Sequence, residues 1–88
     1  MSGCDSLTLA LAQLRRAHPQ WGWCLPGAGG IAGESPSGSI CQVSQGEGGG
    51  WRAVVTVWRD GDWVDGEVMD HDAVRAFVGA WRAVEVVT

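Results

Sequence analysis

The segment from residue 51 to residue 69, WRAVVTVWRDGDWVDGEVM, constrains the fold of this chain more than any other. Two runs rich in β-branched and aromatic residues flank the dipeptide Asp60-Gly61. Asp-Gly between such runs is the strongest short-range signal of a β-hairpin. A two-residue turn also fixes the register, because a slip of one residue would move every side chain to the opposite face. We therefore predict a hairpin over about residues 51–69.

The two faces of this hairpin differ in chemistry. In the predicted register one face carries only apolar residues and glycine, so we expect it to be the core face. Its opposing pairs are Val57/Val64, Val55/Gly66 and Ala53/Val68. The other face is mixed, with Trp58 opposite Trp63 beside charged and polar pairs. Those pairs are Thr56/Asp65, Val54/Glu67 and Arg52/Met69.

A helix is predicted near the N-terminus, over about residues 6–17. Leu7, Leu11 and Leu14 recur at helical spacing. Ser6, or the aspartate before it, is a residue type that caps helices, and Pro19 ends the pattern.

A second helix is predicted over about residues 71–83. Val74, Val78 and Trp81 share one face of it. Asp70 or Asp72 stands where an N-terminal cap is needed. Residues 84–88, VEVVT, are compatible with a short edge strand or with a frayed end.

The segment between the first helix and the hairpin contains two weaker strand signals. Trp21 and Trp23 fall on one face of a short strand, and residues 39–45 alternate as a second strand does. Residues 26–39 are rich in glycine, so we expect an irregular Gly-rich loop there. The sequence thus predicts one α+β domain over residues 1–88, in the order α-β-β-β-β-α. We expect a small antiparallel sheet of three to four strands with both helices on one face.

The stretch PGAGGIAG, residues 26–33, matches the spacing of a dinucleotide-binding turn. Gly27, Gly29 and Ala32 fit the pattern G-x-G-x-x-G/A. That fingerprint requires a helix after the turn, whose free amide groups hold the pyrophosphate. Gly33 and Pro36 would break such a helix. We therefore expect no nucleotide site and no cofactor.

Acidic side chains are concentrated in the hairpin and at the start of the second helix. The chain has a net charge of −4, and six of its ten carboxylates lie within thirteen residues that contain no arginine. Such a cluster repels nucleic acid and favours a basic partner. The six residues are Asp60, Asp62, Asp65, Glu67, Asp70 and Asp72.

No arrangement of residues identifies an enzyme. Catalysis needs a nucleophile beside a base, or two carboxylates in contrasting environments. The residues able to bind metal, Cys24, Cys41, His18 and His71, are scattered, whereas zinc ligands usually come in close pairs. A small metal-binding protein or enzyme that uses these four residues remains an alternative. A Cys24–Cys41 disulfide is also compatible with the sequence.

Composition suggests where the protein acts. No run approaches the ~18 apolar residues of a membrane span, and the N-terminus lacks the basic region of a signal peptide. We therefore expect a cytoplasmic protein without membrane contact. All six basic residues are arginine, and lysine, asparagine and tyrosine are absent. This usage is typical of a GC-rich genome, which points to a bacterium or its phage.

These observations lead to a functional hypothesis, that of a small, acidic, non-enzymatic protein-binding module. Trp58 and Trp63 would anchor it on a basic, partly apolar surface of a larger protein. Asp60, Asp62, Asp65 and Glu67 would surround the anchor. The profile is that of phage-encoded inhibitors of host proteins, such as anti-CRISPR proteins, and we expect no direct contact with nucleic acid. A homodimer that buries the tryptophan face or the C-terminal edge is an alternative.

Overall fold

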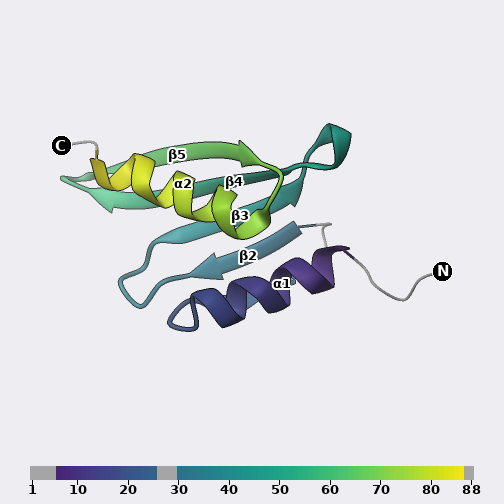
Figure 1. Ribbon diagram of the computed structural model, residues 1–88. Helices are drawn as coiled ribbons and strands as arrows, with labels where there is room; N and C mark the ends of the chain where they lie inside the picture. Colours follow the sequence, from purple (N-terminus) through teal and green to yellow (C-terminus); the bar gives the residue numbers. More distant parts are fainter. Residues whose placement is uncertain (1–5, 26–29, 87–88) are drawn as a thin grey trace.

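The computed structural model describes residues 6–25 and 30–86, which form two helices and one five-stranded antiparallel sheet (Figure 1). The strand order is β1-β2-β3-β4-β5, so each strand pairs with its neighbour in sequence. The predicted α+β class is confirmed, with one strand more than the three to four expected. The elements are α1 (Ser6–Ala17), β1 (Gly22–Cys24), β2 (Gly30–Glu34), β3 (Ile40–Gln45), the 3-10 turn η1 (Glu47–Gly49), β4 (Trp51–Arg59), β5 (Asp62–Asp70) and α2 (Ala73–Val86).

The β4–β5 hairpin forms in the predicted register. Arg59 pairs with Asp62 and the whole ladder follows from that pair. Asp60 and Gly61 have φ angles of 53° and 81°. Positive φ at both central residues is what a type I′ turn requires, and its twist matches that of the strands.

The bounds of α1 agree with the prediction, whereas α2 starts at Ala73, two residues after the predicted start. Of its two candidate caps, Asp72 is the cap, and Asp70 holds the turn that precedes the helix. The N–H of Val74 donates to Asp72 Oδ1 at 2.9 Å, and the N–H of Asp72 donates to Asp70 Oδ1 at 3.0 Å. Helix α2 runs to residue 86 instead of about 83, because Val84 is completely buried against the sheet. The expected strand or frayed end is therefore wrong for residues 84–86, and residues 87–88 lie outside the described part.

The Gly-rich loop expected over residues 26–39 is wrong for residues 30–34, which form β2. Gly33 pairs with Trp23 on β1, and the indole ring lies directly over it. A Cβ atom on Gly33 would lie 2.5 Å from two ring carbons, so the strand needs glycine there. Ile31 of the same strand is buried. Residues 35–39 do form a turn, whereas residues 26–29 lie outside the described part.

The core lies between one face of the sheet and the two helices. Helix α2 covers β4 and β5, and α1 lies beside β1 and β2 on the same side (Figure 1). Helix α2 approaches β5 so closely that a Cβ atom on Gly66 would lie 2.6 Å from the carbonyl oxygen of Ala80. The largest fully buried side chains are those of Phe77, Leu14, Ile31, Val43, Val55, Val84 and Cys41.

Both helices of the described part are short. The longer helix, α2, has 14 residues. Within residues 6–25 and 30–86, no helix combines the length and apolar character needed to cross a bilayer.

Candidate protein-binding surface

The face of the sheet opposite the helices, which we call the open face, is the candidate site. It carries the alternate side chains of the strands that point away from the core. Four of its apolar residues are strongly exposed, Ile40 at 41%, Trp58 at 59%, Trp63 at 50% and Met69 at 63%. From β3, β4 and β5 the open face receives Ile40, Gln42, Ser44, Arg52, Val54, Thr56, Trp58, Trp63, Asp65, Glu67 and Met69.

Trp58 and Trp63 form its most prominent feature. They are cross-strand partners in the hairpin, next to the turn. Their ring centroids lie 5.1 Å apart with an interplanar angle of 73°, an edge-to-face contact. Such contacts fix the mutual orientation of two rings. The hairpin therefore presents a preorganised aromatic pair.

A shallow depression of about 250 Å³ adjoins Trp63. The side chains around it come from β3, β4 and β5 of the open face. They are Ile40, Gln42, Val54, Thr56 and Trp63. The open face is thus both apolar and hollowed beside the aromatic pair, as an interface that receives a partner side chain would be.

The predicted acidic residues are divided between the two faces of the hairpin. Asp65 and Glu67 lie on the open face with the tryptophans. Asp60 lies in the turn, and Asp62 belongs to the other face by strand alternation. The carboxylate of Asp62 accepts a hydrogen bond of 2.9 Å from the N–H of Trp63. All four acidic side chains are exposed.

Glu67 forms an ion pair with Arg52 of the neighbouring strand. The hydrogen bond from Arg52 lowers the pKa of the Glu67 carboxyl, and the same bond raises the pKa of Arg52. The open face also carries Glu34 and Asp65, so its formal charge is −2 from one arginine and three carboxylates. The open face therefore remains acidic after this pairing.

Sequence reasoning missed the contribution of β3 to this surface. Ile40 reaches it because it pairs with Thr56 of β4. Alternation in residues 39–45 places Ile40, Gln42 and Ser44 on one face. However, no two-residue turn sets the register between β3 and β4, since η1 intervenes. That register depends on packing across the sheet.

The structure does not assemble the alternative cysteine and histidine site. Cys24 is exposed and Cys41 is buried on the core face, and both are free thiols. Burial raises the pKa of Cys41 to about 12, which keeps its thiol protonated at neutral pH. His18 packs edge-on against Phe77 with ring centroids 4.8 Å apart. In the described part of the chain, no three His, Cys, Asp or Glu side chains lie close enough to hold a metal ion.

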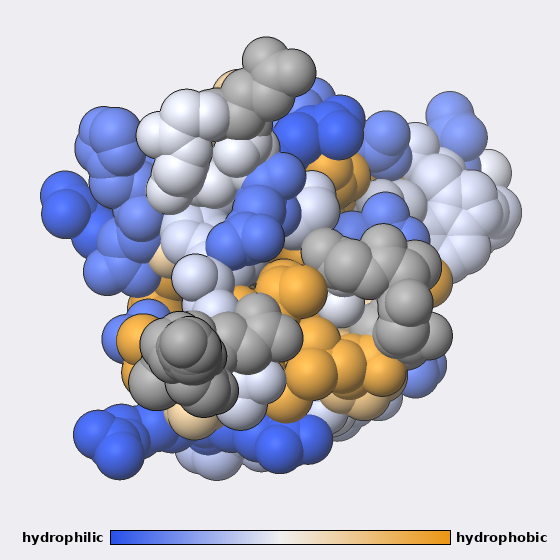
Figure 2. Space-filling model, turned by 90° about the vertical axis from the view of Figure 1, so that its right-hand side faces the viewer, coloured by the Kyte–Doolittle hydropathy of each residue, from blue (hydrophilic) through white to orange (hydrophobic). Residues whose placement is uncertain are grey.

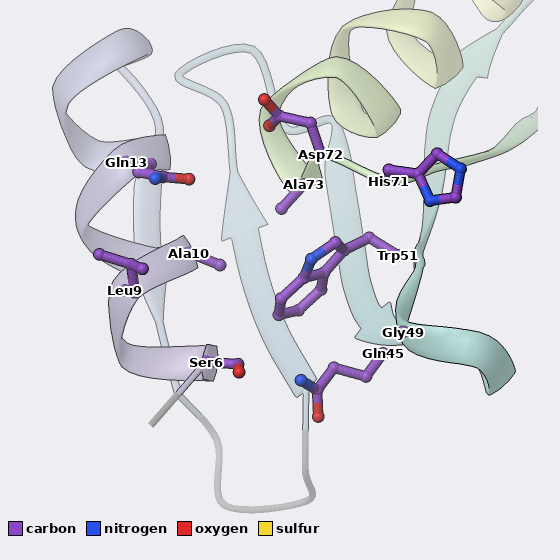
Figure 3. Close-up of a pocket in the computed structure, with 10 residues that line it drawn as sticks. All are labelled: Ser6, Leu9, Ala10, Gln13, Gln45, Gly49, Trp51, His71, Asp72 and Ala73. Carbon is purple, nitrogen blue, oxygen red and sulfur yellow. The ribbon is translucent and has the colours of Figure 1, made fainter. Parts of the chain in front are cut away.

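A pocket of about 380 Å³ lies at the end of the molecule where α1 and α2 begin. Figure 2 views this end and shows hydrophobic side chains near its centre with hydrophilic ones around them. In Figure 3 Trp51 lies between α1 and the start of α2, and His71 points away from it. Asp72, which also lines the pocket, already caps α2. The role of Asp72 as a helix cap explains why a carboxylate lies here. We therefore propose no catalytic or binding function for the pocket.

The exposed aromatic side chains of the open face, in contrast, have no evident role in packing or helix capping. The open face combines exposed aromatic side chains, a depression and negative charge on a regular sheet. Comparisons of the chain with protein-family models, with curated proteins and with solved structures found no match.

Proposed function

We propose that this protein is a small non-enzymatic binding module that docks its open face on a basic, partly apolar surface of a larger protein. One observation carries the proposal: Trp58 and Trp63 lie side by side on the open face with 59% and 50% of their surface exposed. Tryptophan is among the residues that contribute most to binding energy when an interface buries them. Large exposed aromatic groups on a small domain therefore indicate a binding surface.

The charge of the open face supports a basic partner. Asp65, Glu67 and Glu34 outnumber the single arginine of the open face. A partner with positive potential would be steered toward the hairpin, and the steering would weaken with salt. A groove that binds nucleic acid has such potential. We therefore propose a host protein with such a groove as the partner, and inhibition by occupying the groove, as an anti-CRISPR protein does.

The same charge disfavours docking of two copies through their open faces. Two faces that each carry a formal charge of −2 would repel one another on contact. A homodimer that buries the tryptophan face thus lacks the complementarity that a basic partner offers.

The test is capture of a partner from a lysate of a GC-rich bacterium, followed by mass spectrometry. We expect the unaltered protein to retain a basic protein, and the double variant Trp58→Ala, Trp63→Ala to lose it. Leu9→Ala is the matched control, because Leu9 is also exposed but lies on α1. Circular dichroism checks that each variant is folded. Undiminished capture by the folded double variant would contradict the proposal.

A second measurement addresses the charge. Raising the ionic strength from about 0.05 M to about 0.5 M should slow association with the captured partner, because salt screens exposed charges. The variant Asp65→Asn, Glu67→Gln should show a smaller salt effect. Glu85→Gln, which removes an exposed carboxylate of α2 on the other side of the sheet, is the control. An association rate that does not depend on salt would exclude steering by the acidic residues.

A further inference from the structure

We propose that β5 receives an extended segment of the partner as a sixth, antiparallel strand, and that this segment alternates basic and acidic side chains. The inference rests on the proposed function and specifies how the hairpin recognises its partner. Addition of a strand to an exposed sheet edge is a recurring mode of peptide recognition.

β5 is the last strand of the sheet and is nine residues long. Because the hairpin closes with a two-residue turn, the pair Arg59/Asp62 next to it is hydrogen-bonded, and bonded pairs alternate along the ladder. The N–H and C=O groups of Asp65, Glu67 and Met69 therefore point away from β4, toward the free edge. Those of Trp63 do too, but its N–H already donates to Asp62.

Side chains of β5 on the open face would lie beside those of an added strand. A strand paired with β5 would place alternate residues directly beside those of β5 on that face. Asp65 and Glu67 occupy the middle of this row, with Trp63 and Met69 at its two ends. Basic residues in the middle of the added strand, with apolar residues at its ends, would complement this row.

Helix α2 packs on β5 on the other side of the sheet. Gly79 lies over Val68 of β5, since a Cβ atom there would be 3.1 Å from a methyl carbon of Val68. Arg75 and Arg82 stand four residues before and three after Gly79, so they share its side of the helix. With Asp70 they line a depression of about 310 Å³. The other set of side chains on the added strand would thus face arginine, which favours acidic residues.

A second copy of β5 fits this edge poorly. Antiparallel self-pairing centred on Gly66 would place Asp65 of one copy opposite Glu67 of the other. It would also bring the arginines of the two α2 helices toward each other. Like charges directly opposite destabilise a strand pair. The edge therefore disfavours its own copy and suits a strand with the complementary charges.

The probe is a capped heptapeptide of the sequence Val-Glu-Arg-Thr-Arg-Glu-Val, which has no net charge. It would place valine and arginine on the open face and glutamate and threonine toward α2. The control peptide, Val-Arg-Glu-Thr-Glu-Arg-Val, has the same composition and alternation but exchanges the charges between the faces. A third peptide carries N-methyl groups on both arginine amides, which removes two hydrogen bonds to β5.

Binding to the full chain is measured by calorimetry, and amide hydrogen exchange locates the bound peptide. We expect the probe to bind and to protect the N–H groups of Asp65, Glu67 and Met69. Exchanging the charges, or N-methylating the arginines, should weaken binding about tenfold. The variant Asp65→Pro should weaken it similarly, because proline removes an N–H that faces the edge but none that bonds β4. Asp65→Asn, which keeps the N–H, should have a smaller effect.

The inference is overturned if the probe does not bind, if either altered peptide binds as tightly as the probe, or if protection appears elsewhere. The peptide comparisons use the unaltered protein, so they decide the matter even if Asp65→Pro does not fold. Failure of this inference differs from failure of the proposed function. In the first case, folded Asp65→Pro still captures the partner while the Trp58→Ala, Trp63→Ala variant does not. In the second, the variant without the two tryptophans captures the partner fully.

Discussion

Two pairs of tryptophans show how strand alternation gives one residue type two roles. Trp21 and Trp23 are 7% and 4% exposed, and their rings stack with centroids 5.6 Å apart. Both rings also contact Phe77 edge-on, with centroids 5.0 Å away. Trp58 and Trp63 contact one another at a similar distance but remain half exposed. The rings of the first pair contribute to folding, and those of the second remain accessible to a partner.

The buried pair also joins the N-terminal helix to the sheet. The indole Nε1–H of Trp23 donates to the carbonyl oxygen of His18 at 3.0 Å. A guanidinium N–H of Arg15 donates to the carbonyl oxygen of Trp23 at 3.1 Å. These two bonds hold the end of α1 against β1. Replacement of Trp23 should therefore reveal the difference between the buried and the exposed pair most clearly.

Trp23→Ala should have the largest effect on stability. Removing a buried aromatic side chain typically costs about 3–5 kcal/mol, which is a large share of the ~5–15 kcal/mol that holds small domains folded. We expect most of this loss to appear as a lower midpoint in urea unfolding. Trp58→Ala is the control and should change the midpoint little. Equal losses in the two variants would remove the distinction between the pairs.

Gly33→Ala should have the next largest effect. The added methyl group would meet the ring of Trp23 at 2.5 Å, and overpacking of this kind typically costs about 1–3 kcal/mol. Gly22→Ala is the matched control, because its nearest neighbour would be a carbonyl oxygen at 3.8 Å. In a Trp23→Ala background the cost of Gly33→Ala should shrink. If Gly33→Ala destabilises the Trp23→Ala variant as much as the unaltered protein, the Trp23 ring is not the cause of the destabilisation.

We expect His18, whose carbonyl oxygen accepts the hydrogen bond from Trp23, to make the free energy of unfolding depend on pH. This effect should be smaller than the two above. Burial lowers the pKa of His18 below the ordinary value of 6.5, so the unfolded chain binds more protons than the folded one at mildly acidic pH. The contribution of neutral His18 to the stability of the folded state is fully present above about pH 6.5. It is lost as the pH falls below that value. Urea unfolding between about pH 7.5 and pH 5 should show this loss. His18→Gln should reduce it. A pH dependence in this variant equal to that of the unaltered protein would contradict the assignment.

The double variant Trp58→Ala, Trp63→Ala should have the smallest effect on stability. Cross-strand pairs contribute about 0.2–1 kcal/mol, and both rings are already half exposed. Thermal unfolding measures the change. A loss as large as that of Trp23→Ala would mean that the open face stabilises the fold and is not reserved for a partner.

The elements that the sequence predicts well are those with local signals. The Asp60-Gly61 turn fixes the register of β4 and β5 without help from the rest of the chain. The Asp72 cap of α2 and the leucine spacing in α1 act within a few residues. The pairing of Trp58 with Trp63 follows directly from the turn. Its exposure depends in addition on both helices covering the same face of the sheet.

The elements that the sequence predicts poorly depend on contacts between distant residues. In the sequence Gly33 resembles a loop residue. In the structure it belongs to a strand, because the ring of Trp23 lies across it and leaves no room for a side chain. Residues 84–86 resemble a strand, but they continue α2, because Val84 of this helix packs against Gly66 of β5. Ile40 joins the open face only through pairing with β4. Their environments arise from tertiary packing, which overrides local preference.

The order of the strands has a consequence for how the chain folds. Each strand pairs with the one before it, so no pairing has to wait for a distant segment. Such local topologies fold quickly, because little loop entropy is lost before contacts form. During synthesis, however, α2 emerges after every strand of the sheet, and the apolar side of β4 and β5 stays uncovered until then. We expect the nascent sheet to be most prone to aggregation in the interval before α2 leaves the ribosome.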